Sequence, residues 1–161
     1  MVSQKIKVSH IMPCSVNLLT VASKTERDAM TAGAMFISED PPLFVVSVQK
    51  HIRSHRLIEE TGQFILNIAS TEQVKLAKRL GHEKAEDKFK EFGIATSNAK
   101  TVNAPLIEGS FASIECKVIT SFPAGNFTVY IVEAVDFTLN EDLSPIVWDL
   151  DRYYALGNEL K

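Results

Sequence analysis

Apolar runs, separated by short polar or turn-forming segments, set the pattern of this chain. Runs of this kind, bounded by Gly, Pro or charged turns, are typical of buried β-strands. We therefore expect strands over residues 16–23, 29–38, 43–49, 63–70, 111–122 and 127–139. The small residues of 29–38 also indicate a strand whose backbone lies close to another group.

Polar segments between these runs predict the turns that join the strands. Residues 24–28 (KTERD) predict a hairpin-like break, and residues 123–126 (PAGN) are a strong turn signal. Residues 39–42 (EDPP) are expected to form a loop, because prolines cannot sit inside a helix or a central strand.

Three short segments between the strands predict helices. Residues 55–61 are one, with Ser54 placed as its N-cap and Gly62 at its stop position. Residues 71–81 are the second, because apolar residues recur there at threefold spacing and Gly81 closes the segment. Residues 85–93 are the third.

Strands predominate, and they do not alternate regularly with long helices. This order favours an antiparallel barrel with helical insertions over a doubly wound parallel sheet. The chain has 161 residues and shows neither an internal repeat nor a linker, so we expect one domain over residues 1–161.

Composition narrows the function. The chain is 45% hydrophobic and 23% charged, with a formal net charge of -3, which argues against general nucleic-acid binding. The longest apolar runs are far shorter than the roughly 20 residues that span a membrane. The N-terminus also lacks the apolar stretch of a secretory signal, so we expect a cytoplasmic protein.

Several familiar chemical motifs are absent from the sequence. No phosphate-binding glycine loop and no GxSxG nucleophile motif occurs. His51 and His55 have the spacing of a helical zinc pair, but Ile52 follows His51 where such a motif has Glu, so we expect no metal site there. Asp149 and Asp151 lack the further oxygen ligands of a calcium loop.

A basic cluster lies within residues 49–62 (QKHIRSHRLIEETG). Lys50, Arg53 and the start of the predicted helix at Ser54 would place two cations and free backbone N–H groups together. This arrangement suits a phosphate group. A solvated loop is the alternative, and the local sequence leaves both open.

Four segments, taken in order, resemble the flavin reductase-like family, which includes flavoredoxin-like proteins. The segments are DAMTAGAMFISEDPPLFVVSV, SHRLIEETGQFILNIAS, DKFKEFGIAT and APLIEGSFASIECKV. The resemblance runs from about residue 12 to the RYYALG near the end. It implies an FMN-binding split barrel: a mainly β fold with α insertions, built as a six-stranded antiparallel Greek-key barrel. It also implies a homodimer with FMN, or alternatively FAD, in a groove near the subunit interface.

The resemblance assigns roles to individual residues. It implies that residues 29–32 line the flavin ring and the ribityl chain and that Ser47 and Val48 continue that wall. Lys50 and Ser54 match positions that handle the phosphate, whereas the role of Arg53 is a physical inference. Lys88 matches a residue that faces the cofactor or the pyridine nucleotide. The predicted cofactor-binding residues are Ala29, Met30, Thr31, Ala32, Ser47, Val48, Lys50, Arg53 and Ser54.

The sequence departs from the family pattern at two places. Reductases of this family often carry Gly-Asp-His where this chain has Gly125, Asn126 and Phe127. Phe127 cannot hydrogen-bond as His does, but it can stack on a ring, so we take it with Lys88 as a substrate-binding candidate. Asp28 stands where many relatives have Asn, which places a negative charge near the proposed flavin loop.

The resemblance implies an FMN-binding oxidoreductase that passes hydride from NAD(P)H to flavin N5. The reduced flavin would then serve an oxygenase, a redox partner or a small acceptor. Hydride transfer of this kind needs no obligatory acid–base side chain, so we expect no catalytic residue. An electron carrier or flavin-storage protein without NAD(P)H turnover is the alternative, and a split barrel that has lost its flavin is a third.

Overall fold

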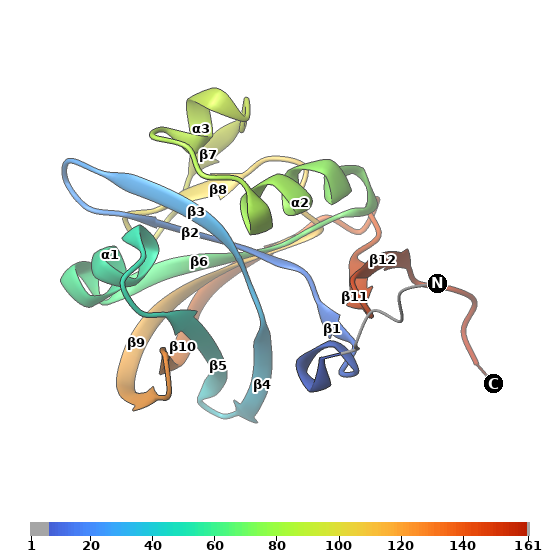
Figure 1. The fold of residues 1–161 in the computed structure, drawn as a ribbon, viewed down its shortest axis with the longest axis horizontal. Coiled ribbons are helices and arrows are strands. Elements are labelled where there is room, and N and C mark those ends of the chain that lie inside the picture. The colour runs from blue at the N-terminus through green and yellow to red at the C-terminus, as the bar shows by residue number, and fades with distance from the viewer. Residues whose placement is uncertain (1–6, 161) are drawn as a thin grey trace.

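A seven-stranded antiparallel sheet forms the centre of the computed structural model, which describes residues 7–160 (Figure 1). Its strand order is β3-β2-β6-β9-β10-β5-β4. The strands are β2 (Asn17–Ala22), β3 (Arg27–Ala32), β4 (Ala34–Glu39), β5 (Pro42–Gln49), β6 (Gln63–Ile68), β9 (Ala112–Ala124) and β10 (Phe127–Leu139). Every neighbouring pair is antiparallel, as the pattern of apolar runs predicts.

Gly33 explains why the sheet has seven strands where six were expected. The predicted strand over residues 29–38 is divided there into β3 and β4, which occupy opposite edges of the sheet. One residue joins these edges, so the sheet is rolled and its two edges meet at Gly33. The loop predicted over residues 39–42 is shorter than expected, because Glu39 ends β4 and Pro42 begins β5.

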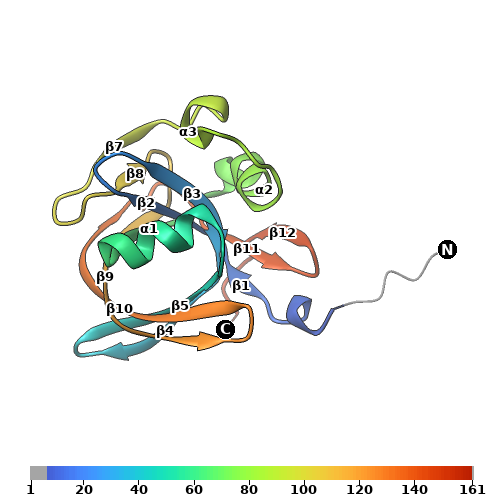
Figure 2. The same ribbon diagram turned by 60° about the vertical axis from the view of Figure 1, so that its left-hand side comes forward.

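Helix α1 (Arg53–Thr61) covers the open side of the rolled sheet (Figure 2). Its Leu57 and Ile58 pack with apolar residues of β2, β5, β6, β9 and β10 in the inner core. The helix ends at Gly62, whose φ of 65° is left-handed, as the stop signal predicts.

The N-cap prediction for Ser54 is wrong. The N-cap is Ile52, which makes no side-chain cap bond, and Ser54 lies inside the first turn. Ser54 is buried there, and its hydroxyl donates to Asp28 Oδ2 at 2.7 Å. A buried tertiary hydrogen bond has therefore replaced the local cap that the sequence suggests.

A second layer packs on the outer face of β2 and β3. It begins with a 3₁₀ turn (Thr71–Gln73), followed by α2 (Val74–His82) and then α3 (Lys88–Glu91). Gly81 lies within the last turn of α2 and does not close it, contrary to the prediction, and α3 is shorter than the expected residues 85–93. Both faces of β2 are buried, which explains its continuous apolar run.

Two small sheets complete the fold. One contains β1 (Cys14–Ser15), β11 (Ile146–Asp149) and β12 (Arg152–Ala155), and it follows a 3₁₀ turn, η1 (Val8–His10). The other pairs β7 (Thr96–Asn98) with β8 (Pro105–Ile107). No helix among residues 7–160 is long and apolar enough to cross a membrane.

Candidate functional site

A cleft of about 620 Å³ opens where the amino-terminal end of α1 faces the end of β3 and the segment after α2. We call it the α1 cleft. Its volume lies within the range typical of small-molecule sites. Most of the residues that the sequence predicts for the site line it together: Met30, Thr31, Ala32, Ser47, Arg53, Lys88 and Phe127.

The other predicted residues do not line this cleft. Ala29 and Val48 are fully buried: Ala29 packs with apolar residues of α2 and α3 on the outer face of β3, and Val48 packs in the inner core. Lys50 donates from Nζ to the carbonyl oxygen of Gly125 at 2.9 Å. The Ser54 side chain faces Asp28.

Arg53 gives the α1 cleft a cationic wall. As the first residue of α1, it stands where the helix leaves N–H groups without intrahelical acceptors and where the helix dipole is positive. Its Nη1 donates to the carbonyl oxygen of Glu86 at 2.6 Å, a neutral partner that leaves the guanidinium charge uncompensated. Lys84 and the acidic Glu83 line the same cleft.

Asp28, Lys88 and Ser54 form a buried polar cluster beneath this wall. Asp28 is 3% exposed, and Lys88 Nζ lies 3.0 Å from its Oδ1. Lys88 Nζ also donates to the carbonyl oxygen of Ala29 at 2.6 Å. The negative charge that Asp28 brings near the cleft is therefore paired with Lys88, while Ser54 donates to its other oxygen.

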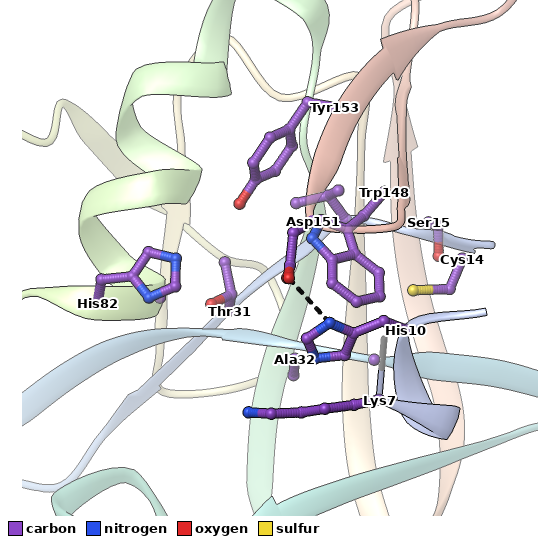
Figure 3. Close-up of a pocket in the computed structure, with 13 residues that line it drawn as sticks. Lys7, His10, Cys14, Ser15, Thr31, Ala32, His82, Trp148, Asp151 and Tyr153 are labelled. Carbon is purple, nitrogen blue, oxygen red and sulfur yellow. Dashed lines mark ion pairs between the residues drawn. The ribbon is translucent and has the colours of Figure 1, made fainter. Parts of the chain in front are cut away.

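A second cleft, of about 730 Å³, shares residues 31–33 and Gly81 with the first (Figure 3). We call it the aromatic cleft, because Trp148 and Tyr153 from the small sheet line it with His10. His10 Nδ1 lies 2.9 Å from Asp151 Oδ2, and its ring meets Trp148 edge-on at 5.2 Å between centroids. Burial raises the pKa of Tyr153, and the nearby carboxylate of Asp151 raises it further.

Sequence reasoning missed this second cleft. Asp151 was rejected as a calcium ligand and read as a solvated or capping residue, and His10 was given no role. His10 and Asp151 lie near opposite ends of the chain, so no local spacing signals their contact. The only local signal was the aromatic content of WDLDRYY.

Gly81 lets α2 lie close to the wall that both clefts share. A Cβ added at Gly81 would lie 2.9 Å from Thr31 Oγ1, closer than a real Cβ tolerates. Thr31 is β-branched and has few rotamers available to relieve such a contact. The absence of a side chain at Gly81 therefore allows α2 to pack closely against the end of β3.

The metal-binding alternative finds no support in this arrangement. Among residues 7–160, no three His, Cys, Asp or Glu side chains gather as metal ligands would. His55 bonds to Thr128 Oγ1 at 2.8 Å, whereas His51 lines the α1 cleft. Burial raises the pKa of the Cys116 thiol to about 12, so it is an inert core residue.

A rolled antiparallel sheet with a cleft of this size at its mouth is typical of β proteins that bind small molecules. The family described as "Flavin reductase like domain" matches residues 9–157, so the chain belongs to this family, as the resemblance predicts. Its fold is the flavin reductase fold, mainly β with few helices.

Individual relatives agree with this assignment. An NADH-dependent flavin reductase from Rhodococcus sp is 28% identical over 148 residues, which cover 88% of this chain and 78% of that protein. Flavoredoxin of Desulfovibrio vulgaris (Miyazaki F) superposes with a TM-score of 0.85 at 25% identity, covering 100% of this chain and 96% of flavoredoxin. The NADH:FAD oxidoreductase SgcE6 of Streptomyces globisporus C-1027 shares the fold, with a TM-score of 0.86, 21% identity and coverage of 98% and 96%.

Proposed function

We propose that this protein is an NAD(P)H-dependent flavin reductase that binds FMN in the α1 cleft. Family membership supports the reaction class. The main observation behind the assignment is the α1 cleft, in which small residues of β3, the polar end of β5 and the cationic start of α1 meet. FAD shares the same flavin phosphate and remains the alternative cofactor.

The residues present fit a flavin. Residues 30–32 form a half-exposed end of β3, and Met30 is the only one of them with a large side chain. Such a surface suits a flat ring and a ribityl chain. Arg53 and the first N–H groups of α1 suit the phosphate better than Lys50, which does not line the cleft, and Ser54, whose hydroxyl donates to Asp28. When bound, the flavin accepts hydride from NAD(P)H and passes the electrons on.

An electron carrier or flavin-storage protein is the second candidate. Phe127 favours it, because this 37% exposed ring lines the cleft where many reductases carry His and cannot donate a hydrogen bond. The comparison with flavoredoxin is compatible with either candidate. A colourless protein that binds no flavin would support the third reading, a barrel without cofactor.

The assembly we propose is a homodimer of single-domain subunits in the cytoplasm. Edge strand β4 exposes Met35, Phe36 and Ile37, an apolar set suited to burial against a second copy. Two fold neighbours are described as a flavin reductase component of a tryptophan halogenase and as component B of nitrilotriacetate monooxygenase. By analogy, we propose that this protein supplies reduced flavin to an oxygenase or another redox partner.

Flavin content and pyridine-nucleotide oxidation of the purified protein test this function. NADH and NADPH are each tested as the electron donor. We expect the protein to bind FMN and to oxidise at least one of the two nucleotides steadily when free flavin or dioxygen is present. Binding of FMN without oxidation of either nucleotide would favour the electron carrier. Failure to bind FMN, FAD or riboflavin would reject both.

A further inference from the structure

The His10–Asp151 pair has the geometry of an oriented acid–base group. Asp151 Oδ2 lies 2.9 Å from His10 Nδ1, and the His10 side chain is 22% exposed. The ring is therefore held in one orientation and is still accessible to a ligand in the cleft. No other side chain that the structure describes bonds to Nε2. A carboxylate on one ring nitrogen sets the orientation of the imidazole and leaves the other nitrogen to exchange a proton.

This pair lies beside the proposed flavin position. Residues 31–33 and Gly81 line both the aromatic cleft and the α1 cleft, so the two clefts adjoin there, and hydride transfer requires a molecule in the aromatic cleft to contact the flavin ring at this junction. Figure 3 shows the His10 ring between the Asp151 carboxylate and the Lys7 side chain, with Thr31 and His82 across the cleft. The titratable side chains that line the aromatic cleft with His10 are Asp151, Lys7, Cys14, His82 and Tyr153.

The reductive half of the proposed reaction does not need such a group, because hydride passes from nicotinamide to flavin without a protein acid. An acceptor that takes a hydride and becomes a hydroxyl compound does need a proton. An oriented imidazole in the adjoining cleft meets that requirement.

We propose that the aromatic cleft binds a planar conjugated carbonyl compound of the quinone class and that His10 is its proton donor. This rests on the proposed function, since the reduced flavin supplies the hydride. Hydride adds to the quinone, the flavin returns to its oxidised form, and the Nε2 proton of the His10 imidazolium passes to the resulting oxyanion. The product is the hydroquinone, and solvent reprotonates His10.

The walls of the cleft match this substrate class. Trp148 and Tyr153 offer aromatic surface for a flat ring. The cationic side chain of Lys7 and the imidazole of His82 favour the negative charge that develops on the quinone oxygen. Asp151 is then a positioning residue that acts through His10.

The test separates the two half-reactions in the flavin-loaded protein. The flavin is reduced anaerobically, and its reoxidation by 1,4-naphthoquinone is followed by stopped flow in the native protein and in H10Q, D151N and D149N. Asp149 is the matched control, because it lies on β11 outside the cleft lining. We expect reoxidation to slow about a hundredfold in H10Q and in D151N but not in D149N, with flavin reduction by NADH unchanged in all three.

Binding provides a readout independent of turnover. Trp148 is the only tryptophan in the chain, so saturable quenching of its fluorescence reports naphthoquinone in this cleft. We expect the native protein, H10Q and D151N to bind naphthoquinone with similar affinity, since the variants lose proton transfer and not the aromatic walls.

Two results would overturn the proposal: absence of saturable quenching, or equal reoxidation rates in H10Q and D149N. Reduction of the flavin by dithionite keeps the test valid even if NADH fails. Failure with NADH alone would count against the proposed reductase function and leave the role of His10 to be judged from the dithionite experiment.

Discussion

The buried ion pair between Lys88 and Asp28 gives the sharpest stability prediction. The substitution K88M removes the ammonium from a carboxylate that is 3% exposed and leaves it with the Ser54 hydroxyl as its remaining side-chain donor. Breaking a buried pair in this way typically costs about 3–5 kcal/mol, because the remaining charge is buried without compensation. For a chain of this size, that loss lowers Tm by roughly 6–20 °C.

The double variant D28N/K88M separates the charge effect from lost packing. It removes both charges, so it should be more stable than K88M alone although it carries one more substitution. The single variant D28N should cost less than K88M, because Lys88 is 15% exposed and its ammonium can reach water.

Thermal and urea unfolding followed by circular dichroism measure these differences. The matched control is K90M on the same helix, whose exposed ammonium makes no ion pair among the described residues and whose loss should change the free energy of unfolding by less than about 0.5 kcal/mol. Equal stability of K88M and K90M, or a double variant no more stable than K88M, would refute the reasoning. Lys88 would then be free to contact a cofactor, as the sequence suggests.

Three further predictions concern other parts of the molecule. In isothermal titration, R53A should weaken FMN binding more than about tenfold and leave riboflavin binding nearly unchanged. K50A should have a smaller effect on FMN binding. If R53A weakened the binding of FMN and riboflavin equally, a contact between Arg53 and the phosphate would be excluded. G81A should weaken flavin binding by displacing Thr31, and an unchanged affinity would show that the shared wall tolerates the shift. Burial raises the pKa of Glu115, but hydrogen bonds from the Thr101 hydroxyl and from backbone N–H groups at residues 100–102 outweigh burial and lower it. Its stabilisation is therefore present above the unfolded pKa of about 4.3 and is lost as pH falls through the lower folded value. E115Q should cost about 1.5–3 kcal/mol at pH 7 in urea unfolding, and a cost that persists unchanged in acid would contradict this.

The strand arrangement was largely predictable because it follows from the placement of apolar runs. The error at residues 29–38 has a physical cause: the run is continuous in sequence, and only the curvature of the sheet makes Gly33 a corner. Likewise, Glu115 lies on the strand face opposite Cys116, yet it is 2% exposed because the loop after β7 covers it with three backbone N–H groups. Such long-range coverage leaves no local trace in the sequence.

The candidate site was predictable only in part. Residues on β3, at the end of β5 and at the start of α1 meet in one cleft, as the resemblance implies. The sequence could not show that Ser54 turns inward to Asp28, since a serine at a helix start is usually read as a cap. It also could not bring His10 to Asp151, whose contact depends on the β11–β12 turn.

The central claim is that bound flavin in this protein accepts hydride from a reduced pyridine nucleotide. Anaerobic stopped-flow mixing of the FMN-loaded protein with NADH, and separately with NADPH, tests it most directly. We predict that the flavin absorption bleaches within seconds with at least one of the two donors. Flavin that stays oxidised with both donors, yet is reduced by dithionite, would contradict the reductase assignment.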